Sequence, residues 1–132
     1  MEDQLISFET AKLAKEKGFD IPVEYGGFNS KMRLTRQISM YKIQLTNWNK
    51  NHTISGKPSF SVPTQSLLQK WLREEHNIHC WLIPAEIDKA YRCYIWSGIK
   101  LNLLESINTS SFKTYEEALE KGLQEALKLI KV

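Results

Sequence analysis

The strongest constraint on this fold lies near the C-terminus, where the sequence marks the start and one face of a helix. Thr114 and Glu117 have the spacing of a capping box, in which the threonine hydroxyl accepts a hydrogen bond from the glutamate backbone N–H. Apolar residues then recur at steps of three and four as far as Ile130. This pattern predicts an amphipathic C-terminal helix. Gly122 lies on its apolar face, which predicts that another backbone approaches closely there.

Two further helices are marked by their ends. Ser7 suits the N-cap of a helix over residues 7–17, and Gly18 offers the left-handed residue that ends it. Pro63 suits the first turn of a second helix, and Asn77 suits its end. The buried stripe of this second helix is expected to hold Leu67, Leu68, Trp71 and Leu72.

Three strands are predicted between the second and the last helix. Residues 78–83 are nearly all apolar and end at Pro84, residues 91–96 are rich in aromatic side chains, and residues 99–103 alternate cleanly. Further toward the N-terminus, residues 39–46 alternate and predict one strand with a solvated face. Gly26-Gly27 and residues 47–58 are predicted to be loops from their composition.

These elements predict a single compact α+β domain over residues 1–132, in which an antiparallel sheet of three to four strands packs with three helices, mainly on one face. Residues 63–132 are expected to form a helix–meander–helix core. Residues 21–62 are expected to form a basic strand and loop segment.

Length and composition are those of an ordinary globular chain. With 132 residues and 42% hydrophobic residues, it can bury one core without metals or disulfides. Two cysteines are too few for a disulfide framework and fit a reducing compartment. The N-terminus lacks a secretion signal, and no apolar stretch approaches the ~20 residues of a membrane span. We therefore expect a cytoplasmic protein without membrane contact.

The middle of the chain is strongly basic. Between Tyr25 and Arg73 there are eight lysines or arginines and no acid, whereas residues 1–24 and 74–132 are net negative. The three segments carry −3, +8 and −2, which together give the total of +3. A patch of one sign raises the local concentration of partners of the opposite sign.

The basic middle supports a nucleic-acid hypothesis, because cations neutralise phosphates and exposed rings stack on bases. Trp48 lies beside asparagines and a lysine and is the best candidate for an exposed stacking ring. The alternative is an ordinary solvated surface. The tentative site for nucleic acid or another partner is Lys31, Arg33, Arg36, Lys42, Trp48, Lys50 and Lys57.

Metal binding and catalysis find little support. His76, His79, Cys80 and Cys93 could supply four zinc ligands, but His79 and Cys80 are neighbours in a strand and point to opposite faces. We expect both cysteines to be core residues and expect no metal or cofactor. Because no nucleophile, phosphate-loop or metalloprotease motif is present, we name no catalytic residue and expect no enzyme.

The exposed face of the predicted sheet is a second candidate for partner binding. It would present His79, Trp81 and either Tyr91 or Arg92, and a large apolar surface patch usually marks a partner. The alternative is that the first helix or the middle strand covers this face.

Three segments, residues 14–20, 63–74 and 114–123, resemble small uncharacterised proteins of phages and integrated elements in gut Bacteroidetes. The resemblance covers about half of the chain. It implies a mobile-element setting and brings no functional residues with it. The helix–strands–helix order also resembles a double-stranded RNA-binding domain, but such domains start their final helix with basic residues, and this chain has Thr114-Tyr115-Glu116-Glu117 there.

Taken together, the sequence predicts a small non-catalytic phage-type accessory protein that works by binding a macromolecule, with a host or phage protein as the favoured partner. The alternative is a nucleic-acid-binding protein that uses the basic segment 31–57.

Overall fold

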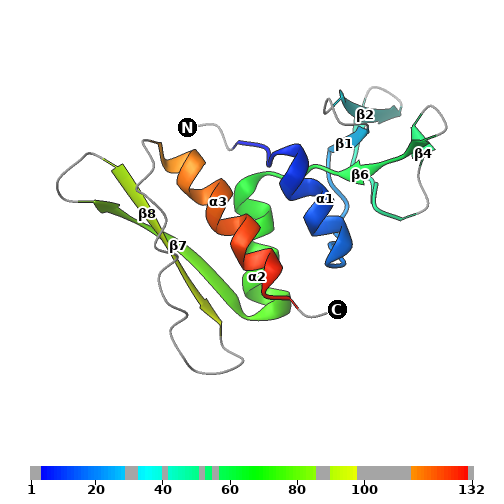
Figure 1. The fold of residues 1–132 in the computed structure, drawn as a ribbon. Coiled ribbons are helices and arrows are strands. Elements are labelled where there is room, and N and C mark those ends of the chain that lie inside the picture. The colour runs from blue at the N-terminus through cyan, green and yellow to red at the C-terminus, as the bar shows by residue number, and fades with distance from the viewer. Residues whose placement is uncertain are drawn as a thin grey trace. The chain divides into compact units, whose positions relative to one another are not determined.

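The structure is a computed structural model that describes residues 4–28, 33–39, 42–50, 53–54, 57–85, 90–97 and 114–130 (Figure 1). Its chain divides into two compact units. We call Leu5–Thr64 the N-terminal unit, and Gln65–Val132 together with Met1–Gln4 the C-terminal unit. The sequence predicted one domain over residues 1–132, in which it distinguished a basic segment, residues 21–62, from a core, residues 63–132; the division into units follows residue 64. The predicted α+β class, with three helices and antiparallel strands, is confirmed.

The N-terminal unit begins with helix α1 (Phe8–Glu16), whose two ends are those expected. The Ser7 hydroxyl accepts a hydrogen bond from the Thr10 backbone N–H at 3.3 Å, and Gly18 has a φ of 91°. Ala11 and Ala14 form the buried side of the helix. Two small residues there allow close packing, and the Phe8 ring meets the Phe60 ring edge to face at 5.2 Å.

The rest of this unit contains two antiparallel sheets. Their strands are β1 (Tyr25–Phe28), β2 (Arg33–Ser39), β3 (Lys42–Gln44), β4 (Thr53–Ile54), β5 (Lys57–Pro58) and β6 (Phe60–Ser61). One sheet has four strands in the order β3-β2-β1-β6, and the other pairs β4 with β5.

Two sequence predictions are wrong in this sheet. Residues 39–46 do not form one strand, because β2 ends at Ser39 and pairs antiparallel with β3, where Lys42 lies opposite Ser39. The Gly26-Gly27 pair is not a loop but the centre of β1. A Cβ on Gly26 would overlap the Trp48 ring, and one on Gly27 would lie 2.7 Å from the Phe60 ring. These glycines therefore make room for aromatic rings against the strand.

The C-terminal unit follows the predicted order of helix, strands and helix. Helix α2 (Gln65–His76) is followed by Asn77, the predicted terminator, which has a φ of 52° and separates the helix from β7 (Ile78–Ala85). Strand β7 pairs antiparallel with β8 (Ala90–Ser97), and α3 (Tyr115–Lys128) is the last helix. Pro84 does not end its strand, since it pairs opposite Tyr91; an edge position tolerates a residue without an N–H. The predicted strand over 99–103 lies outside the described residues.

Helices α2 and α3 pack on the β7–β8 hairpin and on each other (Figure 1). The hairpin contributes Ile78, Cys80, Cys93 and Ile95 to this core. The buried positions of α3 confirm the apolar face read from the sequence: Ala118, Leu119, Gly122, Leu123, Ala126 and Leu127.

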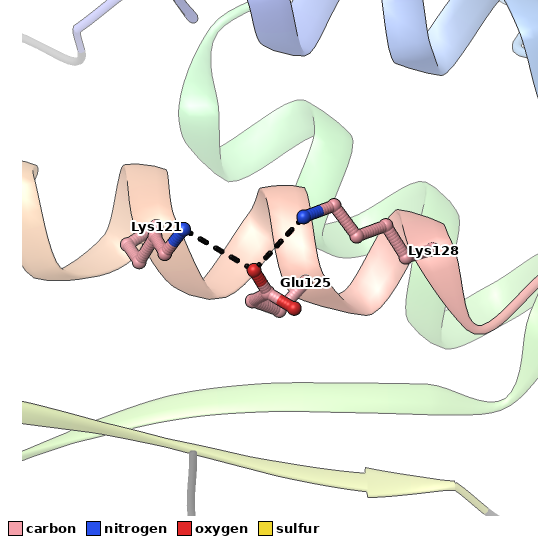
Figure 2. A network of polar contacts seen from close by, with 3 residues as sticks. All are labelled: Lys121, Glu125 and Lys128. Atoms are coloured by element: carbon pink, nitrogen blue, oxygen red, sulfur yellow. Dashed lines mark hydrogen bonds and ion pairs between the residues drawn. The ribbon is translucent and has the colours of Figure 1, made fainter. Parts of the chain in front are cut away.

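The exposed side of α3 carries a small charge network. Lys121 and Lys128 lie 3.2 and 3.1 Å from the same oxygen of Glu125 (Figure 2). Partial burial raises the pKa of the Glu125 carboxyl, but the hydrogen bonds from Lys128 and Lys121 outweigh that effect and lower it. At the start of the helix the Thr114 hydroxyl accepts from the Glu117 backbone N–H at 3.1 Å, so the predicted cap is confirmed.

None of the helices in the described ranges combines the length and the apolar character needed to cross a bilayer.

Candidate functional site: the aromatic face of the hairpin

The β7–β8 hairpin carries a row of rings on the face opposite its buried core. In the strand register His79 lies opposite Trp96, and Trp81 lies opposite Tyr94. The His79 and Trp96 rings are 5.1 Å apart edge to face, and the Trp81 and Tyr94 rings stack 5.9 Å apart at 21°. We call His79, Trp81, Ile83, Tyr94 and Trp96 the aromatic face.

This face is open over its central residues. Trp81 keeps 37% of its surface exposed and Ile83 keeps 43%, whereas His79, Tyr94 and Trp96 are half-buried. Neighbouring positions on both strands, such as Cys80 and Cys93, are buried beneath the helices. The alternation of a β-strand therefore separates a packed face from a solvated aromatic face.

The sequence predicted part of this face. His79 and Trp81 were expected on it and lie there. Tyr91 does not: its ring meets Tyr115 of α3 at 5.8 Å, edge to face. Arg92 pairs opposite Ile83 in the register, and its side chain is not among those described. Tyr94 and Trp96 were not predicted to lie on this face. Their alternation within residues 91–96 was a signal, but only the register of the two strands places them opposite Trp81 and His79.

The aromatic part of the predicted basic site is not confirmed, because Trp48 is buried. Trp48 is only 4% exposed, so the prediction that it is an exposed stacking ring is wrong. Its indole N–H donates to the Val23 carbonyl at 3.3 Å, and its ring packs against Gly26. The Ser59 hydroxyl donates to the Trp48 carbonyl at 2.8 Å.

The residues beside Trp48 are also structural. The Asn47 side-chain amide donates to the Asp20 carbonyl at 2.9 Å, and that of Asn49 donates to the Phe19 carbonyl at 2.8 Å. The Asn49 side-chain oxygen accepts from the Ser61 backbone N–H at 2.8 Å. The run Asn47-Trp48-Asn49 thus ties three separate backbone segments together, and its polar residues do not mark an open surface.

The other members of the basic site lie in the N-terminal unit. Arg33 and Arg36 are on β2, Lys42 is on the neighbouring β3, and Lys57 is on β5. Their side chains, and the whole of Lys31, are outside the described part of the chain. Lys50 is exposed, as expected.

Metal ligands do not gather in the described ranges, where no three histidine, cysteine or acidic side chains come together. Cys80 and Cys93 are free and buried, which confirms them as core residues. Their sulfurs are 3.0 Å apart, a proximity that the sequence did not indicate.

The start of α3 carries the acidic residues that were noted in the sequence. Tyr115 and Glu117 are exposed in its first turn, and Glu116 is half-buried.

Comparison with protein-family models, with curated proteins and with solved structures gives no match to this chain.

Proposed function

We propose that this protein is a non-catalytic accessory protein that binds a partner protein through the aromatic face of the β7–β8 hairpin. The single observation that carries the proposal is the exposure of Trp81 and Ile83 within a row of paired rings. Aromatic side chains are enriched at the centres of interfaces, where they bury much area at small entropic cost. A contiguous exposed apolar patch is typical of a partner site.

The charge of the C-terminal unit favours a protein partner over nucleic acid. Residues 65–132 with Met1–Gln4 contain eleven acidic and nine basic residues, so this unit has a net charge of −2. Binding to a phosphate backbone depends on an excess of cations. The mobile-element setting implied by the resemblance makes a host or phage protein the partner in this proposal.

The test places a photo-crosslinking amino acid at Trp81 of the full chain in the cell of origin. A protein captured there is purified, and its affinity is measured by calorimetry for the native chain and for Trp81→Ala. We expect Trp81→Ala to weaken binding by at least about 2 kcal/mol, the size of an interface hot spot.

Tyr115→Ala provides the matched control, because Tyr115 is an aromatic residue of the same unit, 44% exposed, outside the aromatic face. It should leave the affinity nearly unchanged. Equal affinities for Trp81→Ala and the native chain, or capture that is as efficient from Tyr115 as from Trp81, would contradict the proposal.

A second candidate function is nucleic-acid binding by the N-terminal unit. Residues 5–64 contain nine basic and four acidic residues, a net charge of +5, and β2 and β3 place Arg33, Arg36 and Lys42 on neighbouring strands. Trp48 has no part in this candidate, because it is buried.

Fluorescence anisotropy with single- and double-stranded oligonucleotides tests this second function. Binding by the N-terminal unit should fall steeply with salt and weaken further in Arg33→Glu and Lys42→Glu. Binding that is lost in Trp81→Ala instead would assign nucleic acid to the aromatic face. Absence of binding at low salt would rule out this second function.

A further inference from the structure

Two buried cysteines meet on the packed face of the hairpin. Cys80 on β7 lies opposite Ile95, and Cys93 on β8 lies opposite Leu82, so the two cysteines are diagonal neighbours across the ladder. Both side chains are at most 5% exposed, and their sulfurs are 3.0 Å apart. The fold thus brings together two thiols whose residues are 13 positions apart in the chain.

Helix α3 packs against the two sulfurs at Gly122, a residue without a side chain. A Cβ on Gly122 would lie 2.9 Å from the Cys80 sulfur and closer still to the Cys93 sulfur. The sequence had suggested that another backbone approaches Gly122, but cysteine side chains fill that place. Glycine in a helix interior costs about 1 kcal/mol relative to alanine, and here it provides the space in which both thiols sit.

The neighbouring helix also holds this part of β7. The Gln69 side-chain amide of α2 donates a hydrogen bond to the Cys80 backbone carbonyl. The position of Cys80 is therefore held both by the pairing of β7 with β8 and by a side chain of α2.

The two thiols are not equivalent. The hydrogen bond with Cys93, together with burial, raises the pKa of the Cys80 thiol. The same contact lowers the pKa of the Cys93 thiol against the effect of burial. The thiolate is the reactive form of cysteine, and the 3.0 Å contact keeps the second sulfur in place to resolve the product of the first.

We propose that Cys80 and Cys93 are a redox-active pair that closes to a reversible intramolecular disulfide when the protein meets hydrogen peroxide. The Cys93 thiolate attacks one peroxide oxygen, which gives a sulfenic acid and releases hydroxide. The Cys80 sulfur then attacks the Cys93 sulfur, the S–S bond forms, and a second hydroxide leaves. The two thiol protons end in water, so two thiols and one peroxide give one disulfide and two waters.

The geometry makes this disulfide a reversible one. A disulfide bond is about 2.03–2.05 Å long and usually joins Cα atoms 4.4–6.8 Å apart, whereas diagonal neighbours in an antiparallel pair are about 7–8 Å apart. Closure therefore draws β7 and β8 together. Strained disulfides are more easily reduced than structural ones, so dithiothreitol should reopen this bond.

Formation of the disulfide also shifts residues of the aromatic face. Cys80 lies between His79 and Trp81, and Cys93 precedes Tyr94, so a shift of either strand changes the spacing of the stacked Trp81–Tyr94 pair. Control of binding by oxidation rests on the proposed function, whereas formation of the disulfide does not.

The experiment exposes the folded full-length chain to hydrogen peroxide, removes the peroxide with catalase, unfolds the chain and labels free thiols with N-ethylmaleimide for intact-mass analysis. The untreated chain should take up two labels. The oxidised chain should take up none and weigh about 2 Da less, because two hydrogens leave. Dithiothreitol should restore both labels, and a peptide map should join Cys80 to Cys93.

Cys80→Ser is the matched control, because it removes the resolving thiol and keeps its size. Its Cys93 should proceed to oxygen adducts of about 16 or 32 Da and should form no intramolecular disulfide. The proposal is overturned if native chains keep two labels under conditions that oxidise the unfolded chain, or if they gain oxygen without losing hydrogen.

The link to binding has its own readout. Once a partner protein has been captured, its affinity for the native chain should change several-fold on oxidation, whereas its affinity for Cys80→Ser should stay unchanged. A chain that forms the disulfide but binds no protein would contradict the proposed function alone.

Discussion

One tryptophan in each unit, Trp48 in the N-terminal unit and Trp81 in the C-terminal unit, shows how the surroundings of a residue in the sequence differ from its surroundings in the fold. In the N-terminal unit Trp48 stands among asparagines and a lysine, yet it is buried and tied to Val23 and Gly26. In the C-terminal unit Trp81 stands in a nearly apolar strand, yet it is more than a third exposed. The polarity of the neighbouring residues is therefore a poor guide to burial here, because the phase of a strand and its long-range partners decide which face is covered. For Trp48 the sequence prediction was wrong, whereas the alternation of its strand had placed Trp81 correctly.

The units also differ in charge. The N-terminal unit, residues 5–64, carries a net charge of +5, whereas the C-terminal unit, residues 65–132 with Met1–Gln4, carries −2. The excess positive charge lies in the unit in which Trp48 is buried, so Trp48 is not the exposed stacking ring that the sequence suggested beside the basic residues.

The sharpest test of this comparison is the pair Trp48→Ala and Trp81→Ala. We expect Trp48→Ala to lower the free energy of unfolding by about 3–5 kcal/mol, because it leaves a large cavity beside Gly26. Trp81→Ala should cost no more than about 1 kcal/mol, since the residue is partly solvated. Urea denaturation followed by circular dichroism measures both. Similar losses for the two variants would remove the basis of the comparison.

The next effect concerns packing in the C-terminal unit. Gly122→Ala should destabilise by about 1–3 kcal/mol despite the better helix propensity of alanine, because its Cβ overlaps the two cysteine sulfurs. In a Cys93→Ala background the same change should become much less harmful. A double-mutant cycle measures this coupling, and additive effects would show that the sulfurs do not occupy the space at Gly122.

A smaller effect is expected from the rings of the aromatic face. Trp81 and Tyr94 stack across the strands, and such pairs contribute about 0.5–1.5 kcal/mol beyond the area that they bury. The cycle of Trp81→Ala, Tyr94→Ala and the double variant should give a coupling within this range. A value near zero would mean that the two rings act independently and that the face is not preformed for a partner.

The smallest effect concerns charge on α3. Glu125→Gln should cost about 0.3–0.5 kcal/mol at pH 7, because two exposed lysines lose the negative charge with which they pair. Since folding lowers the pKa of Glu125, its contribution is complete above the unfolded value of about 4.3 and is lost as the pH falls through the lower folded value. Unfolding curves of both chains at pH 7 and at pH 2 measure this. A difference that persists at pH 2 would contradict the electrostatic explanation.

The elements that could be predicted are those whose signals are local. Ser7, Asn77 and Thr114 lie at helix boundaries as expected, and the apolar period of α3 gives its buried face residue by residue. The predictions that failed depend on contacts made elsewhere. Gly26 and Gly27 suggested a loop because glycine favours turns, and only the rings of Trp48 and Phe60 explain why they form a strand.

The aromatic face, too, was predicted only where its signals in the sequence are local. Alternation within residues 78–83 placed His79 and Trp81 on one face, because a strand's period of two is local. Tyr94 and Trp96 joined them only through the register of β7 with β8, which the sequence left open.

The amino-acid sequence by itself determined where the helices begin and end, which of their faces are apolar, and that the chain is α+β, because caps and periodicity act over a few residues. Tertiary structure alone decided that Trp48 is buried, that Trp81 is exposed, and that Cys80 meets Cys93 beneath Gly122. Those outcomes depend on strand register and on packing between distant segments, which no short stretch of sequence specifies.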